Sequence, residues 1–380
     1  MTNTRFHPRE LLRAFLRPID PALLLLLGLL LAYAIFVMMS ASPERVVSQQ
    51  VNSVVALAAM WAAARLPAQR LLNLAPPLYV VGVLLLVAVE LFGETSKGAT
   101  RWLNIGVTRI QPSEIMKIAM PLMLAWYFQQ REGQIGLREF IVAGLLLLVP
   151  VGLIMMQPDL GTAVLVTAAG VYVIYFAGLS WKLIVPVVAA GVIGIGAIAG
   201  FGDQICQPGV DWPGMREYQK HRVCTLLDPT QDPLGKGFHI IQSTIAIGSG
   251  GVFGKGWKDG TQTHLAFLPE RHTDFVFSVL SEELGLIGIV VLLAIYTMLL
   301  LRGFYIAAMA PALGTRLLGG AITMIFFTYA FVNMGMVSGI LPVVGVPLPF
   351  ISYGGTALVT LCLGIGILMS IQRSRVLAQA

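Results

Sequence analysis

The sequence predicts an all-α polytopic membrane protein with about ten transmembrane helices and a long extracytoplasmic loop between spans seven and eight. Of its 380 residues, 57% are hydrophobic and 12% are charged, whereas soluble domains carry about 25% charged residues. The mean hydropathy is +0.81. Apolar runs of about 18 or more residues recur along the chain, each long enough to cross a membrane. Because these runs lack the alternation of barrel strands, we expect helices.

The spans follow one another with short connections, except for two longer outer loops. We place them at residues 20–40, 46–65, 74–92, 113–129, 138–156, 160–178, 183–201, 275–301, 317–339 and 353–371. Arginines at positions 5, 9, 13 and 17 precede the first span and predict a cytoplasmic N-terminus. An even number of spans then returns the C-terminus to the cytoplasm. Since the first apolar run is too long and no small-residue cleavage site follows it, we expect no cleaved signal peptide.

The chain is expected to form a single integral membrane domain over residues 1–380. Residues 1–19 and 372–380 would be cytoplasmic, and residues 202–273 would form a periplasmic loop of short helices and turns, with 238–247 as the best helical candidate. The net charge of +6 follows the topology, so no nucleic-acid partner is expected. Cys206 and Cys224 lie in the long loop, where a disulfide and two free thiols are both compatible with the sequence.

The most polar segment lies at the entrance of the eighth span. Residues Glu270 to Asp274 are five consecutive polar residues beside a long apolar run. Charges beside a membrane are costly and typically functional. Asp274 could instead cap the helix, in competition with Thr273. The histidine spacing matches no zinc motif, so no metal site is predicted.

Two further sites place acids and bases at the outer ends of spans. Glu114 and Lys117 follow Pro112 at the start of the fourth span, and their i, i+3 spacing lets them pair on one helix face. They could form a structural ion pair or line a cavity. Asp159 precedes the sixth span, where it could cap the helix and line the same cavity.

Two glycine-rich segments do not fit ordinary helices. Residues 248–256 look like a phosphate loop but lack the Walker pattern, so we interpret them as a loop on the membrane surface in which Lys255 could contact a lipid phosphate. Residues 341–355 contain three prolines and are too apolar for an exposed loop, which predicts a re-entrant segment buried in protein. Asn333 and Ser338 precede it and are expected to bond between helices.

Four separated motifs together resemble the SEDS family (shape, elongation, division and sporulation). They are the segments 111–114 (QPSE), 157–162 (QPDLGT), 267–275 (FLPERHTDF) and 339–355 (GILPVVGVPLPFISYGG). The resemblance covers nearly the whole chain and is closer to the elongation members than to the division members. Residues 206–212 match no feature of the family.

The resemblance implies ten transmembrane helices and a peptidoglycan glycosyltransferase of the bacterial inner membrane that polymerises lipid II at the outer face. It implies a class B penicillin-binding protein as the transpeptidase partner, together with other rod-complex proteins and membrane lipid. By resemblance, Asp274 matches the catalytic aspartate. Glu114, Lys117 and Asp159 match polar residues that line the central cavity.

The chemistry of lipid II suggests a role for each residue. The acceptor is a sugar hydroxyl, from which the Asp274 carboxylate would take a proton as general base. The leaving lipid diphosphate needs positive charge, for which Arg101, Arg271 and Lys117 are candidates, with Lys97 as a further substrate-binding residue. Mg²⁺ or another divalent cation could assist. A single displacement would invert the anomeric centre.

Two other classes of function stay open at this point. A flippase or transporter of lipid-linked precursors would also use intramembrane charges and broken helices. However, the charges cluster on the outer side, and the sequence shows no inverted repeat of the broken segments. A scaffold that only positions a transpeptidase would not need an acid beside a cluster of bases.

Overall fold

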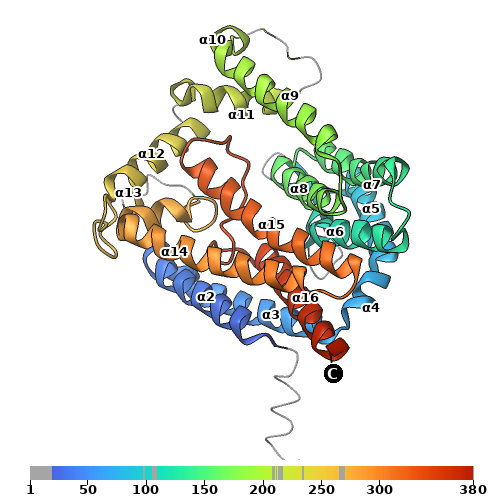
Figure 1. The fold of residues 1–380 in the computed structure, drawn as a ribbon. Helices are drawn as coiled ribbons and strands as arrows, with labels where there is room; N and C mark the ends of the chain where they lie inside the picture. The colour runs from blue at the N-terminus through green and yellow to red at the C-terminus, as the bar shows by residue number, and fades with distance from the viewer. Residues whose placement is uncertain are drawn as a thin grey trace, which may run out of the picture.

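The computed structural model shows a bundle of long helices (Figure 1). It describes residues 19–96, 99–104, 109–207, 210, 212, 217–232, 235–264 and 270–379. The first half of the bundle consists of α2 (Pro21–Ala41), η1 (Pro43–Arg45), α3 (Val46–Arg65), α4 (Ala68–Asn73), α5 (Ala75–Phe92), α6 (Pro112–Gln130), α7 (Leu137–Met156), α8 (Leu160–Phe176) and α9 (Trp181–Gly200). The second half consists of α14 (Val276–Ala308), α15 (Leu313–Val337) and α16 (Gly355–Gln379).

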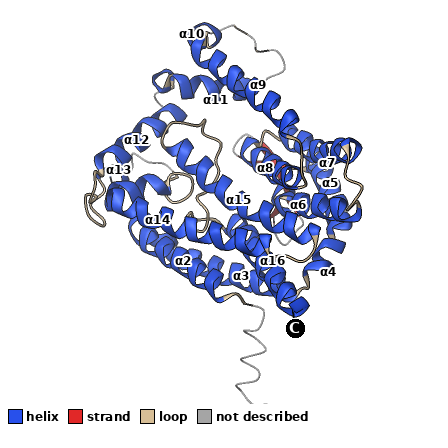
Figure 2. Ribbon diagram, viewed as in Figure 1, coloured by secondary structure: helices blue, strands red, loops and turns tan. Residues whose placement is uncertain are grey.

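Each predicted span coincides with a helix in the described part of the chain, as Figure 2 shows by the predominance of blue. Eight of the described helices are long and apolar enough to cross a membrane. The two others are α8, which is shorter, and α6, which carries the pair Glu114 and Lys117. The polytopic helical fold is therefore confirmed. One span differs from its prediction, because α14 is interrupted at Gly285, whose φ of 62° and ψ of −159° are not helical.

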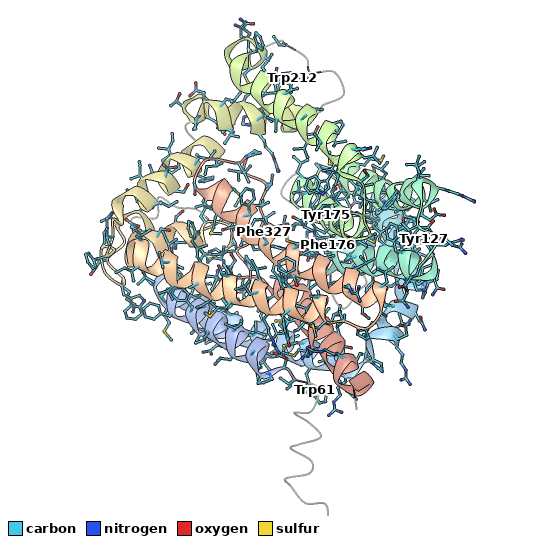
Figure 3. The ribbon with its side chains drawn as sticks, viewed as in Figure 1. Trp61, Tyr127, Tyr175, Phe176, Trp212 and Phe327 are labelled. Atoms are coloured by element: carbon cyan, nitrogen blue, oxygen red, sulfur yellow. A yellow bond between two sulfur atoms is a disulfide. The ribbon has the colours of Figure 1, made fainter. Side chains whose placement is uncertain are left out.

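The centre of the bundle is α15, most of which is buried. It packs against α14, α8, α6 and α16, while α3 packs along α16. Tyr329 and Phe326 lie in this core, whereas Phe327, which is labelled on α15 in Figure 3, is exposed. Because α15 also contacts the helices that carry the predicted site residues, it is the common support of the site.

The two ends of the bundle differ in their connections. At one end, Asp20 caps α2 by accepting from the Leu23 N–H at 2.9 Å and pairs with Arg302 of α14 at 2.5 Å. At the other end, a three-stranded antiparallel sheet of β1 (Glu94–Ser96), β2 (Ala99–Asn104) and β3 (Arg109–Ile110) leads into α6. The ion pair ties α2 to α14, and the sheet holds the segment that carries Arg101 beside α5 and α6.

The long loop before α14 contains short helices, as predicted. They are α10 (Gly202–Ile205), α11 (Glu217–Leu227), η2 (Pro229–Gln231), α12 (Lys236–Ser249) and α13 (Thr261–His264), so the helix expected at 238–247 is confirmed within α12. Cys206 and Cys224 form a disulfide that joins the end of α10 to α11. Trp212, labelled at the top of Figure 3, donates its indole N–H to the Ile205 carbonyl at 2.9 Å.

Within the connection between α15 and α16, residues 341–354 are non-helical and, except for Gly345, buried or half-buried, as the prolines predict. We call these residues the proline-rich segment. Asn333 bonds from α15 to this segment and to the turn before α14, so its partners are non-helical segments and not the second helix that the sequence predicted. The same prediction for Ser338 is also wrong, because its hydroxyl donates to the Met334 carbonyl one turn back in α15.

Candidate active site

Asp274 lies in a tight turn immediately before α14. We call residues 270–275 the Asp274 turn. The turn begins at Glu270, which has a positive φ of 55°. The Glu270 carbonyl accepts from the N–H groups of Thr273 at 3.0 Å and Phe275 at 3.4 Å. The N-cap of α14 is Phe275, so Asp274 lies one residue before the cap. The interpretation of Asp274 as the helix cap is therefore wrong.

Three consecutive carbonyls of this turn are bonded to distant parts of the chain. The His272 carbonyl accepts from the Tyr353 N–H at 2.8 Å, and the Thr273 carbonyl accepts from the Ser352 hydroxyl at 2.6 Å. The Asp274 carbonyl accepts from the Asn333 amide at 2.9 Å. Because Asn333 and Ser352 are buried, these bonds fix the main chain of the turn against α15 and the proline-rich segment.

The Asp274 carboxylate faces a glycine of the proline-rich segment. A Cβ atom built at Gly345 would lie 3.4 Å from Asp274 Oδ2, and Gly345 has a φ of 75° that favours glycine. Gly345 is exposed and Asp274 is half-buried. The carboxylate therefore lies against a surface without a side chain, where a substrate hydroxyl could approach it.

The same segment connects Asp274 with Asp159. We call Val344 to Val346 the valine strip. A Cβ atom at Gly161 would lie only 2.8 Å from the Val344 carbonyl, which shows that the first turn of α8 packs directly on the strip. The Asp274 turn and the first turn of α8, which Asp159 caps, thus both lie against one three-residue strip. The structure brings these two predicted site residues to the same end of the bundle.

Asp159 is the centre of a polar cluster. Its Oδ1 accepts from the Thr162 N–H at 3.3 Å and lies 3.8 Å from Arg101 Nη1, while its Oδ2 accepts from the Gln111 amide at 3.0 Å. Arg101 also donates to the Pro158 carbonyl at 2.6 Å. The predicted cap is confirmed, and Arg101 of β2 is placed over it.

Glu114 and Lys117 form the predicted pair at the start of α6. Lys117 Nζ lies 2.6 Å from Glu114 Oε1, and the Lys117 side chain is only 5% exposed. The Thr360 hydroxyl donates to Glu114 Oε2 at 3.3 Å, and the Lys117 ammonium lies 5.3 Å from the centre of the Tyr329 ring. Because its charge is already paired inside the bundle, Lys117 is less accessible to a diphosphate than the half-buried Arg101.

A cavity of about 520 Å³ adjoins the Glu114 side of the site. Its polar end includes Asn52, Arg109, Gln111 and Glu114. The rest of the wall is mostly apolar and comes from α3, α5, α6 and α16, with lining residues that include Val55, Leu78, Ile115, Ile118, Val359 and Leu363. The cavity therefore combines a polar end with an apolar wall inside the bundle.

A second group of bases surrounds the Asp274 turn. The His272 ring lies 5.8 Å from the Tyr353 ring, and the Arg45 guanidinium lies 5.2 Å from the centre of that same ring. Burial lowers the pKa of His272 below its ordinary value, and the charge of Arg45 lowers it further, while Glu270 and Glu44 oppose the shift. This surrounding favours the neutral form of the His272 ring.

In this group, Arg271 was predicted from the sequence as a site residue, whereas Arg45 was not. The signal was present, because Arg45 is a base in a short outer connection, where the positive-inside rule disfavours one. Arg271 is half-buried and lies within electrostatic range of Glu44. Lys97 lies outside the described residues. Among the residues that the structure describes, no three His, Cys, Asp or Glu side chains form a candidate metal site.

A family model matches residues 17–376 of the chain and is described as the FtsW, RodA and SpoVE cell cycle proteins. The chain belongs to this family. It is 48% identical over 363 residues to the peptidoglycan glycosyltransferase MrdB of Escherichia coli K12, with 94% of each chain covered. It is 34% identical to the peptidoglycan glycosyltransferase RodA of Treponema pallidum, over 76% of this chain and 80% of that one.

Solved structures of the family have the same fold. A chain of a peptidoglycan synthase complex, described in terms of coordinated polymerization and crosslinking, superposes with a TM-score of 0.77 at 34% identity over 94% of this chain and 98% of that one. The crystal structure of Thermus thermophilus RodA gives a TM-score of 0.68 at 30% identity, over 94% of this chain and 97% of that one. These similarities cover nearly the whole bundle and therefore include the site.

Proposed function

We infer that this chain is a peptidoglycan glycosyltransferase that polymerises lipid II into glycan strands during cell elongation. Membership of the FtsW/RodA/SpoVE family and the names of its close relatives support this activity. The observation that assigns the activity to specific residues is that the Asp274 carboxylate and the first turn of α8, which Asp159 caps, both lie against the valine strip. The exposed glycine of this strip, Gly345, faces the Asp274 carboxylate and leaves room for a sugar hydroxyl at the end of a membrane-spanning bundle.

Asp274 acts as the general base on the acceptor hydroxyl. A sugar hydroxyl is a weak nucleophile at neutral pH, and a carboxylate within hydrogen-bond reach removes its proton as the new glycosidic bond forms. The three carbonyl bonds of the Asp274 turn hold the carboxylate in place before substrate binds, as an efficient base requires. The acceptor oxygen then attacks the anomeric carbon in one step, with inversion, and the lipid diphosphate leaves.

Arg101 and Arg271 stabilise the leaving diphosphate. Both are half-buried bases near the two acids of the site, and a leaving diphosphate needs positive charge rather than a proton. Arg45 adds a third base on the Asp274 side. Lys117 keeps the Glu114 carboxylate in position inside the bundle, and Lys97 belongs to the same outer loop as Arg101. A divalent cation such as Mg²⁺ is compatible with a diphosphate but has no assigned ligands.

The cavity beside Glu114 accommodates the start of the lipid tail. Its volume of about 520 Å³, its apolar wall and its polar end at Arg109 and Gln111 suit an isoprenoid chain attached to a phosphate. A polymerase of lipid II must keep the tail in the bilayer while the sugars stay in water. A cavity that continues from the polar site along α3, α5 and α16 meets this requirement.

The protein works as one integral domain over residues 1–380 in the bacterial inner membrane. We propose that residues 1–19 and 372–380 are cytoplasmic and that residues 202–273 lie in the periplasm with the site. The synthase complex among its structural relatives, which coordinates polymerization and crosslinking, supports a transpeptidase partner, and we propose a class B penicillin-binding protein. Other rod-complex proteins are proposed from the family resemblance alone. This orientation agrees with a disulfide in the long loop, since disulfides persist in oxidising compartments.

A lipid-linked precursor transporter is the alternative, and the break in α14 favours it, because transporters use discontinuous helices. Reconstitution of the purified protein with lipid II separates the two functions. We expect glycan strands on a gel, with products lost when lipid II is withheld. Translocation of lipid II across vesicles without any polymer would contradict the proposed activity and support the transporter.

A further inference from the structure

The break in α14 is filled by residues 250–258, which we call the glycine loop. The N–H groups of Lys255 and Gly256 donate to the carbonyls of Glu282 and Glu283 at 2.9 and 3.1 Å, before the break. After it, the N–H groups of Leu286 and Ile287 donate to the carbonyls of Gly251 and Val252 at 3.0 and 3.2 Å. The loop thus replaces hydrogen bonds that an unbroken helix would make, as backbone within a membrane requires.

Glycine is needed for this close contact between two backbones. A Cβ atom at Gly254 would lie 2.1 Å from the Glu283 carbonyl, and one at Gly285 would lie 2.3 Å from the Gly254 nitrogen. Both glycines have positive φ, 79° and 62°. The glycine loop therefore lies flat against α14 and cannot be lifted without breaking its bonds to that helix.

A buried carboxylate of α14 holds the glycine loop against that helix. The Glu282 side chain is fully buried, and its Oε1 accepts from Lys255 Nζ at 2.7 Å, the Thr261 hydroxyl at 3.0 Å and the Gln262 N–H at 3.1 Å. Lys255 is thus paired with Glu282, so the contact with a lipid phosphate suggested by the sequence is not supported. Glu283, beside it, accepts from the Ser40 hydroxyl of α2.

The tip of the loop is apolar and exposed. Phe253 is 81% exposed and Val252 is 53% exposed, although the loop that carries them is firmly bonded to α14. They continue the exposed apolar surfaces of the two neighbouring helices, which comprise Phe36 and Met39 of α2 and Leu286, Ile287 and Val290 of α14. A contiguous exposed apolar patch of this kind marks a surface that contacts lipid or another protein.

The other end of the loop has the composition of a membrane interface. The Trp257 ring stacks on Phe36 with centroids 5.3 Å apart, and its indole N–H donates to the Phe36 carbonyl at 3.3 Å. Lys258 Nζ lies 4.6 Å from the centre of the Trp257 ring. Tryptophan is enriched at lipid headgroup level, and lysine extends its charge from there to water.

We propose that the glycine loop is a membrane anchor embedded in the leaflet on the side of the Asp274 turn. Val252 and Phe253 lie among acyl chains, and Trp257 and Lys258 lie at headgroup level. Lipid is the occupant because the tip continues the exposed apolar sides of α2 and α14, two helices that are long and apolar enough to cross a membrane. The glycine loop is bonded to the C-terminal end of the helical stretch Val276–Leu284, and Asp274 lies just before the N-terminal end of that stretch. Contact of the loop with lipid therefore fixes the position of the site relative to the bilayer.

Spin labels at single cysteines test the anchor in the full-length protein. Cys206 and Cys224 are bridged and Cys362 is buried, so a label goes to an introduced cysteine. We would label Phe253→Cys in nanodiscs of phosphatidylethanolamine and phosphatidylglycerol. Val290→Cys, on the lipid-facing side of α14, and Thr230→Cys, on the exposed η2, serve as the membrane and water controls. Val252→Cys repeats the test if the first variant does not fold.

The readout is the collision of the label with oxygen, which concentrates in lipid, and with a water-soluble nickel chelate. We expect the label at residue 253 to be accessible to oxygen and protected from nickel, with a depth between the two controls. Nickel accessibility equal to that of residue 230 would overturn the anchor. Protection from both reagents would also overturn it, because a protein surface rather than lipid would then cover Phe253.

Discussion

The two acidic parts of the site are held in different ways. Glu114 and Asp159 are fixed through their carboxylate oxygens, which bind Lys117, Thr360, Gln111 and Arg101. The Asp274 turn is instead fixed through its main chain, by bonds to three successive carbonyls. The first arrangement uses the acids as structural groups. The second holds the main chain around an acid, which positions that acid before it exchanges a proton.

The largest effect on stability is expected where a carboxylate is part of the packing. Lys117→Met leaves the Glu114 carboxylate inside the bundle without its cation, which should lower the free energy of unfolding by about 3 kcal/mol. Thermal unfolding in detergent measures it. The double variant Lys117→Met with Glu114→Gln removes both charges and should recover most of the loss. A change below about 1 kcal/mol in the single variant would show that the pair is not structural.

The main-chain support of Asp274 is tested at Asn333. Asn333→Leu removes the donor to the carbonyls of Asp274 and Val346, which should lower the free energy of unfolding by about 2 kcal/mol. It should also slow polymerisation, because the Asp274 turn loses one of the three hydrogen bonds that its carbonyls accept. Thr323→Val is the control on the same helix, equally buried, since the Thr323 hydroxyl donates only to Gly319 of its own helix in the described structure. Equal effects of both variants would contradict the role of Asn333.

Glycine at position 345 is expected to matter more for activity than for stability. Gly345→Ala places a methyl group 3.4 Å from Asp274 Oδ2 and strains a positive φ, at about 1 kcal/mol. Gly339→Ala has nearly the same φ, 74° against 75°, but its methyl group would contact Ile240 and Thr244. Similar losses of stability with a loss of polymerisation only at residue 345 would support the site. Equal loss of activity in both would count against it.

The smallest effect is expected for His272. Burial and Arg45 lower its folded-state pKa below 6.5, so the unfolded chain binds more protons between the lowered value and 6.5. Stability should therefore fall as pH drops through that window, and the full penalty is present below it. His272→Gln should flatten this part of the profile of melting temperature against pH. An unchanged slope would mean that another group causes it.

Much of this fold follows from hydropathy, because each apolar run became a helix at the expected place. Local spacing also predicted the pair of Glu114 with Lys117 and the cap at Asp159. The break at Gly285 could not be predicted from the sequence. A glycine within an apolar run is compatible with a continuous helix and equally with a broken helix whose backbone bonds to a distant loop. The interpretation that Asp274 caps α14 was also wrong because of distant contacts. The turn that carries Asp274 is fixed by Asn333 and Ser352, which are far away in the sequence.

The central claim is that the Asp274 carboxylate takes the proton of the acceptor sugar, and the most direct measurement is the polymerisation rate of Asp274→Asn with purified lipid II. The substitution keeps the shape of the side chain and leaves the three carbonyl bonds intact. We predict a loss of at least about 100-fold in rate, with the free energy of unfolding unchanged within about 1 kcal/mol. A folded variant that polymerises lipid II at the wild-type rate would contradict the assignment.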